Sequence, residues 1–168
     1  MLTIILTERI EMKIKLLVDE DVANYKKTSM VIAFPYCSFK CGDACQNKHL
    51  ASMPDIDVPV ESIVQRYIRN PFTSAVVLQG LEPLDTLEDV FAFISAFRDA
   101  SNDDIVVFTG YEERDVPVQE FIQFVKQNKY QNIILKVGGY VEKLPSVYSH
   151  KLGVELASNN QYAFEINC

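Results

Sequence analysis

The sequence predicts an α/β protein in which mostly parallel strands form a truncated, open (β/α) partial barrel or a curved sheet. Short apolar segments rich in β-branched residues alternate three times with amphipathic helical segments, after which the alternation stops. This alternation is typical of parallel strands joined by right-handed helical crossovers. The chain has 168 residues, whereas a complete eight-fold barrel usually takes about 250. A partial barrel therefore fits better than a closed one.

Four buried strands are expected from the apolar runs. They are residues 30–34, 75–78, 105–108 and 133–135. Polar and apolar residues alternate over 13–16 and Leu17 and Val18 extend the pattern, which predicts an opening strand over 13–18 at an edge of the sheet. Two more short strands are expected at 154–156 and 162–166, whereas 46–59 looks irregular.

Three amphipathic helices are expected after the cysteine-rich region. Pro59 suits the first turn of the first helix, and the residue pair ending in Pro71 stops it. Thr86 is expected to cap the second helix, with Asp89 completing a variant capping box. Apolar residues at helical spacing define the inner faces. These residues are Val60, Ile63, Val64, Tyr67 and Ile68; Leu87, Val90, Phe91, Ile94 and Phe97; and Val118, Phe121, Ile122 and Val125.

The composition is that of one packed domain spanning residues 1–168, in which 1–11 are expected to form a disordered extension before the strand pattern. The net charge of −7 argues against nucleic acid as a partner. No apolar run is long enough for a membrane span, and the opening apolar run is too short for a signal sequence. We therefore expect a cytoplasmic protein, in which cysteines bind metal more readily than they form disulfides.

Three of the four cysteines, Cys37, Cys41 and Cys45, lie within nine residues. Thiolates are soft ligands that favour zinc, copper(I) or iron–sulfur clusters. Three of them on one loop suit a metal centre that leaves one position free. Gly42 would let the loop fold back, and Lys40 would help to keep the thiolates ionised. A redox or disulfide loop and three unrelated thiols are the alternatives.

Each of the four buried strands is followed by residues suited to a ligand site. The cysteine loop follows the first strand, and Gly80 and Glu82 follow the second. Glycine-containing turns at 109–111 and 138–139 follow the other two. Ligands of barrels and open α/β sheets bind at the carboxyl ends of the strands. The sequence therefore predicts one site at this edge, although each glycine alone also suits a plain turn and Glu82 also suits a solvated or capping carboxylate.

Four segments of the chain carry a resemblance to a known family. They are Cys37-x3-Cys41-x3-Cys45-Gln-Asn, Gly80-Leu81-Glu82-Pro83-Leu84, Thr109-Gly110-Tyr111-Glu112, and the stretch from Gly153 through Ser158-Asn159-Asn160-Gln161. In order, they resemble the cluster loop, the Gly-Gly-Glu-Pro segment, a Thr-Gly-Tyr turn and a closing Ser-x-Asn-Gln stretch of the radical S-adenosylmethionine (SAM) superfamily. The closest resemblance is to the activating proteins of anaerobic ribonucleoside-triphosphate reductase.

The chain also departs from the pattern of that family. The second cysteine spacing is one residue longer than the usual C-x3-C-x2-C. Leu81 replaces the second glycine of the Gly-Gly-Glu-Pro segment. Residues 22–28 stand where an Asp-Gly-Pro-Gly stretch is usual. These differences suggest a divergent branch.

The resemblance implies a [4Fe–4S] cluster held by Cys37, Cys41 and Cys45, with SAM chelating the fourth iron through its amino and carboxylate groups. The cofactor-binding residues that it implies are Gly80, Glu82, Ser158 and Gln161, with Glu82 accepting from the amino group of SAM. The implied enzyme cleaves SAM reductively to a 5′-deoxyadenosyl radical. Its implied partners are a glycyl radical enzyme, the large subunit of an anaerobic ribonucleotide reductase, and an electron donor such as flavodoxin.

Three other functions stay open. The radical chemistry would also suit a peptide or a small-molecule substrate. A non-catalytic zinc or iron–sulfur module would need His49 or Cys168 as a fourth ligand if it held zinc. The longer cysteine spacing and Leu81 would also fit a member of the family that has lost catalysis.

Overall fold

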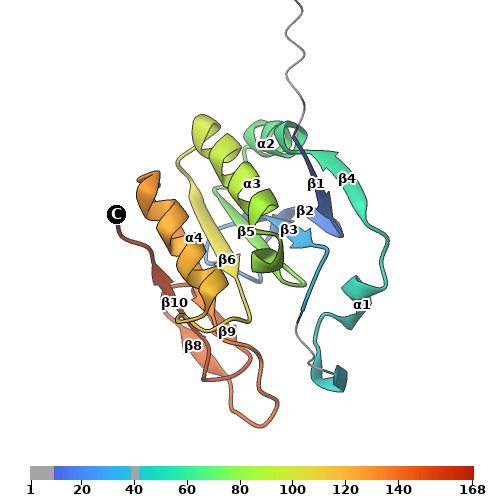
Figure 1. Ribbon diagram of the computed structural model, residues 1–168, viewed down its shortest axis with the longest axis vertical. Coiled ribbons are helices and arrows are strands. Elements are labelled where there is room, and N and C mark those ends of the chain that lie inside the picture. Colours follow the sequence, from blue (N-terminus) through green and yellow to red (C-terminus); the bar gives the residue numbers. More distant parts are fainter. Residues whose placement is uncertain (1–9, 39–41) are drawn as a thin grey trace, which may run out of the picture.

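The computed structural model of the chain describes residues 10–38 and 42–168 (Figure 1). The strands are β1 (Glu11–Ile14), β2 (Leu16–Asp21), β3 (Ser29–Phe34), β4 (Ile56–Pro59), β5 (Ala75–Gly80), β6 (Asp104–Phe108), β7 (Ile133–Val137), β8 (Val147–Ser149), β9 (Val154–Leu156) and β10 (Tyr162–Glu165). The helices are α1 (Lys48–Ala51), α2 (Val60–Arg69), α3 (Leu87–Ala100) and α4 (Val116–Gln127), with short 3-10 helices η1 (Gly42–Ala44) and η2 (Pro83–Thr86).

A six-stranded sheet of order β10-β7-β6-β5-β3-β2 forms the centre of the molecule. Its four inner strands, β7, β6, β5 and β3, are parallel, and the two edge strands are antiparallel to their neighbours. The expected α/β architecture with a mostly parallel sheet is therefore confirmed. The carboxyl ends of the four inner strands meet at one edge, which brings the loops that follow them together.

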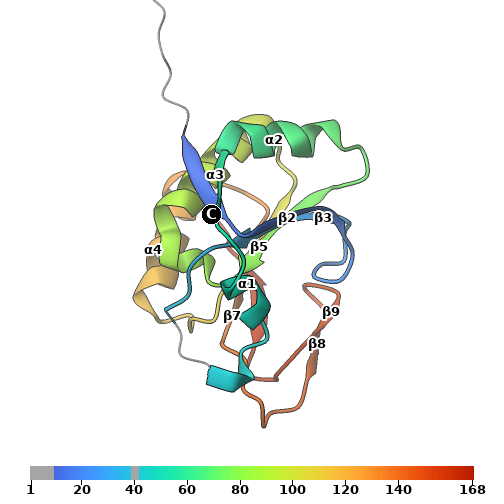
Figure 2. The same cartoon turned by 90° about the vertical axis from the view of Figure 1, so that its right-hand side faces the viewer.

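The helices α2, α3 and α4 cover only one face of this sheet (Figure 1). Alternate strand residues such as Ile32 and Leu78 are buried against them. The intervening residues, such as Val31 and Val77, pack with Tyr25 and with the chain around β8 and β9 on the other face. Figure 2 shows β8 and β9 on the side away from α3 and α4. This two-sided burial explains why the inner strands read as continuous apolar runs.

The beginning of the chain differs from the strand expected over 13–18. Lys15 separates β1 from β2; its Nζ donates to the Met53 carbonyl and lies 2.7 Å from Asp55. The strand β1 pairs with β4 in a separate two-stranded sheet, whereas β2 forms the expected edge of the main sheet. Glu11 is paired with Pro59, so it belongs to the fold. Ile10 also contacts the fold, because its carbonyl accepts from the Val60 N–H at 2.9 Å, and residues 1–9 lie outside the described residues.

Two other local expectations were wrong. The region 46–59 contains α1 and β4 rather than being irregular throughout. Thr86 occupies the cap position of α3 but makes no capping bond; its hydroxyl donates to the Pro83 carbonyl of η2 instead. On α3, Phe93 is fully buried in the core, whereas Phe91 is only half-buried and stacks on Phe124.

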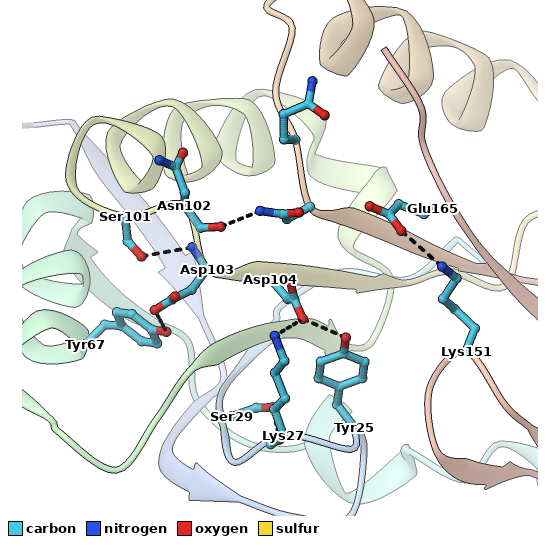
Figure 3. A network of polar contacts seen from close by, with 12 residues as sticks. Tyr25, Lys27, Ser29, Tyr67, Ser101, Asn102, Asp103, Asp104, Lys151 and Glu165 are labelled. Atoms are coloured by element: carbon cyan, nitrogen blue, oxygen red, sulfur yellow. Dashed lines mark hydrogen bonds and ion pairs between the residues drawn. The ribbon is translucent and has the colours of Figure 1, made fainter.

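Polar contacts fix the amino end of the sheet, opposite the edge where the glycine turns lie (Figure 3). Asp104 at the start of β6 accepts from the Tyr25 hydroxyl at 2.8 Å and pairs with Lys27 at 2.6 Å. Its neighbour Asp103 accepts from the Tyr67 hydroxyl of α2 at 2.6 Å. Within 10–38 and 42–168, no helix has both the length and the apolarity that a membrane crossing requires.

Candidate metal centre and its cavity

A cavity of about 370 Å³ lies at the carboxyl ends of the inner strands. The loops that follow β3, β5, β6 and β7 all contribute to its wall. Five of the site residues expected from the sequence line it: Cys37, Cys45, Gly80, Glu82 and Gln161. The structure therefore brings together residues that are up to 124 positions apart in the sequence.

The cysteine loop forms one side of this cavity. Cys37 is exposed, Cys45 is half-buried, and both line the wall. Cys41, the third expected ligand, lies outside the described residues. Within the described ranges, no three His, Cys, Asp or Glu side chains are grouped as a metal site.

The segment 80–82 is hydrogen-bonded to both flanks of the cysteine loop. Before the loop, the Glu82 N–H donates to the Tyr36 carbonyl at 2.7 Å. After the loop, the Asn47 side-chain amide donates to the Gly80 carbonyl at 2.8 Å. Gly80 has a φ of +105°, and a Cβ there would lie 2.7 Å from the Ala33 Cα. Only glycine fits this position, where β5 pairs with the strand that leads into the loop.

Glu82 is a buried carboxylate with three donors. Its Oε1 accepts from the Thr109 hydroxyl at 2.7 Å and from the Leu84 N–H at 3.1 Å. Its Oε2 accepts from the Gly110 N–H at 2.8 Å. Burial raises the pKa of Glu82 to about 7, against the lowering effect of these hydrogen bonds. Glu82 thus ties the turn after β5 to the turn after β6.

Lys136 is a cavity residue that the sequence analysis missed. The expected strand stopped at Leu135, but β7 continues and carries the Lys136 side chain to the cavity wall, where it is 6% exposed. Its ammonium donates to the Gly138 carbonyl at 2.8 Å. Burial lowers the pKa of Lys136 to about 8, and the negative charge of Glu82 opposes this shift. The sequence signal that could have indicated Lys136 is a lysine directly after the apolar run of β7.

A second set of contacts joins the cysteine loop to the turns after β5 and β6. Asp85, in η2, accepts from the Ser38 N–H at 2.5 Å and from the Ser38 hydroxyl at 3.1 Å. The Tyr111 hydroxyl donates to the same carboxylate at 2.6 Å. We call Asp85, Ser38 and Tyr111 the Asp85 clamp. It holds the residue that directly follows Cys37.

The closing stretch of the chain supports the turn after β7. Gln161 donates through Nε2 to the Gly138 carbonyl at 3.1 Å, and its Oε1 accepts from the Ser158 N–H at 3.2 Å. The Ser158 hydroxyl accepts from the Val141 N–H at 3.2 Å. Ser158 is fully buried and does not line the cavity, so only Gln161 of this expected pair reaches it.

The two side chains considered as a fourth zinc ligand lie elsewhere. His49 is exposed on α1 and does not line the cavity. The Cys168 sulfur lies 3.1 Å from the Tyr130 carbonyl, near the start of β7 and thus at the opposite end of the sheet. The structure therefore gives no support to a four-ligand zinc site built from either residue.

A family model described as a 4Fe-4S single cluster domain matches residues 28–145, more than two thirds of the chain. The chain belongs to this family. The matched range contains all three clustered cysteines and the turns after β5, β6 and β7. Among curated proteins, no match was found. The expected [4Fe–4S] cluster is thus supported, and the donor set fits it, because thiolates are the usual ligands of such clusters.

Proposed function

We propose that this member of the 4Fe-4S single cluster domain family is a radical SAM enzyme of the glycyl-radical-activating type. One observation carries the proposal: the cysteine loop shares a cavity with polar groups from three other loops. Its volume of about 370 Å³ is in the range of small-molecule sites. A cluster that only transfers electrons does not need a cavity of this size next to it.

In this proposal Cys37, Cys41 and Cys45 would hold three irons of the cluster, which would leave one iron for SAM. When bound, the cluster supplies the electron that cleaves SAM to methionine and a 5′-deoxyadenosyl radical. The role of the chain is to hold SAM in one orientation. Gln161 offers an amide on the wall, and Lys136 offers a cation. The Lys136 ammonium donates to the Gly138 carbonyl at 2.8 Å and to the Thr109 carbonyl at 3.5 Å, which leaves one of its three donors. We assign this donor to the carboxylate of SAM.

The proposed substrate is a glycine of the large subunit of an anaerobic ribonucleotide reductase. That glycine gives up one hydrogen atom, and 5′-deoxyadenosine and a glycyl radical are the products. A reductant of the flavodoxin type would supply the electron in an anaerobic cytoplasm. The main sheet has six strands, fewer than the eight of a closed barrel. This number and the exposure of Cys37 support a truncated barrel whose site a macromolecular substrate can approach.

A second candidate is a non-catalytic iron–sulfur module. The hydrogen bonding of Glu82 favours it, because Thr109, Gly110 and Leu84 already donate to this carboxylate. A carboxylate has about four acceptor positions, so an amino group of SAM would find one position left. The two candidates differ in a simple property, namely whether the loaded protein cleaves SAM.

The test is anaerobic reconstitution of the wild-type chain, Cys45→Ala and the matched control Cys168→Ala. We expect about four irons and four sulfides per chain in the wild type and in Cys168→Ala. Under dithionite these two proteins should release 5′-deoxyadenosine from SAM, whereas Cys45→Ala should not. A fully loaded wild-type protein that leaves SAM intact would refute the enzyme and leave the non-catalytic module.

A further inference from the structure

We propose that the Asp85 clamp positions the cluster loop, by holding Ser38 in place before any cluster is bound. The proposal rests on the cysteine ligands named above and is independent of whether SAM is cleaved. The Asp85 carboxylate accepts two bonds from Ser38, one from its backbone N–H and one from its hydroxyl. The bond to the backbone N–H of Ser38 fixes the position of the main chain next to Cys37. A contact to the Ser38 side chain alone would not do this.

Tyr111 makes the clamp a contact among three loops. Its hydroxyl donates to Asp85 at 2.6 Å and also lies 3.1 Å from the Ser38 hydroxyl. Tyr111 comes from the turn after β6, Asp85 from η2 after β5, and Ser38 from the cysteine loop after β3. Three loops that are distant in the sequence are thus joined at one carboxylate.

The far end of the cluster loop has its own anchor, the bond from Asn47 to the Gly80 carbonyl at 2.8 Å. The two anchors differ in chemistry. The Asn47 bond is neutral, whereas the bonds of the clamp end on a carboxylate and are therefore the stronger kind. The bond from Tyr111 to Asp85 is part-buried, which limits competition from water, whereas the two bonds from Ser38 are exposed. We therefore assign the larger share of loop positioning to the clamp.

The first test measures how fast the reconstituted holoprotein loses its cluster to an iron chelator under native conditions. Asp85→Asn and Tyr111→Phe should lose the cluster about tenfold faster than wild type, the effect of one lost charge-assisted hydrogen bond. Ser38→Thr keeps both donors and should behave like wild type. Loss at the wild-type rate in both Asp85→Asn and Tyr111→Phe would overturn the proposal.

The chain offers a matched control at the opposite end of the sheet. Tyr67→Phe removes a tyrosine-to-aspartate bond of the same length, from Tyr67 to Asp103 at 2.6 Å. This variant should lower the midpoint of unfolding but leave cluster loss within about twofold of wild type. If Tyr67→Phe releases the cluster as fast as Tyr111→Phe, the effect is general destabilisation and the clamp has no special role.

A second measurement needs no cluster. In the iron-free full-length chain, the Ser38 amide should be protected from hydrogen exchange, and Asp85→Asn should speed its exchange about tenfold. Equal exchange in the two proteins would overturn the proposal. Neither readout depends on SAM, so a wild-type protein that fails to cleave SAM would refute the enzyme function and leave the clamp standing.

Discussion

Glu82 is a carboxylate under two opposing influences. It is 1% exposed, and this burial disfavours its charged form. Three hydrogen bonds favour the charged form, but burial is the larger effect and its pKa rises to about 7. The folded chain therefore binds this proton more tightly than the unfolded chain does. The stability that the protonated Glu82 contributes is fully present below pH 4.5 and is lost as the pH rises through about 7.

The Glu82→Gln variant tests this pH dependence in the iron-free chain. Glutamine does not titrate, so the wild type should lose about 3 kcal/mol relative to the variant between about pH 4.5 and about pH 8. Urea unfolding of both proteins at the two pH values measures the difference. Lys136, whose pKa is lowered to about 8, begins to titrate at the upper end of this range, but it is present in both proteins, so the comparison of the two cancels most of its contribution. Parallel pH dependences in the two proteins would contradict the assigned environment of Glu82.

Lys136 is the second residue with a specific expectation. Lys136→Met keeps most of the side-chain volume but removes the cation, so the affinity of the reconstituted protein for SAM should fall about tenfold or more. Equilibrium binding of SAM measures this. Lys151→Met is the control, because Lys151 lies away from the cavity and pairs with Glu165 at 3.0 Å. Unchanged SAM binding by Lys136→Met would remove Lys136 from the proposed site.

The pairing of β3 with β5 sets the position of the cluster loop. Phe34, the last residue of β3, lies opposite Gly80, the last residue of β5. Beyond this pair, the bond from the Glu82 N–H to the Tyr36 carbonyl extends the contact to the residue before Cys37. The loop thus begins from a sheet pairing, and any shift of Gly80 shifts the loop.

Gly80→Ala should therefore disturb both stability and cluster binding. A Cβ at Gly80 would lie 2.7 Å from the Ala33 Cα, at a φ of +105°. We expect the free energy of unfolding to fall by about 3 kcal/mol, and iron loading to fall with it. Gly139→Ala is the control, because its Cβ would meet its nearest neighbour at 3.4 Å, and it should cost less than about 1 kcal/mol. Urea unfolding and iron analysis compare the two; equal losses would refute this role for Gly80.

The sequence predicted those helices and strands that a local pattern of apolar residues marks. The inner strands and the helices α2, α3 and α4 lie where apolar runs and helical spacing placed them. The strand β4 was missed because it is only four residues long, ends in Pro59 and forms by pairing with the distant β1. The short strand β8 was also missed, and it forms by pairing with β9. The break at Lys15 depends on Met53 and Asp55, which no local pattern connects to it.

The positions of the strand ends and the spacing of the cysteines were enough to predict which residues meet at the candidate site. Cys37, Cys45, Gly80, Glu82 and Gln161 do meet at one cavity. Side-chain orientation was not predictable, because it depends on contacts between loops. Thus Glu82 proved to be bonded to Thr109 and Gly110, Ser158 lies behind the cavity wall, and Lys136 was missed.

The apolar core and the candidate site occupy different parts of the molecule. The apolar core between the sheet and its three helices, together with the polar contacts of Asp103 and Asp104, occupies one face and the amino end. The cavity, the cysteine loop and the titratable pair Glu82 and Lys136 occupy the carboxyl end. This division would allow the loops to carry the cluster and the proposed SAM at a distance from the apolar core.

The central claim is that a [4Fe–4S] cluster presents one open iron to the cavity and that SAM binds there. Electron paramagnetic resonance of the dithionite-reduced holoprotein, with and without SAM, tests it most directly. We predict that SAM changes the spectrum of the reduced cluster in the wild type and in Cys168→Ala. A spectrum that stays the same at saturating SAM, in a protein with a full iron and sulfide content, would contradict the account.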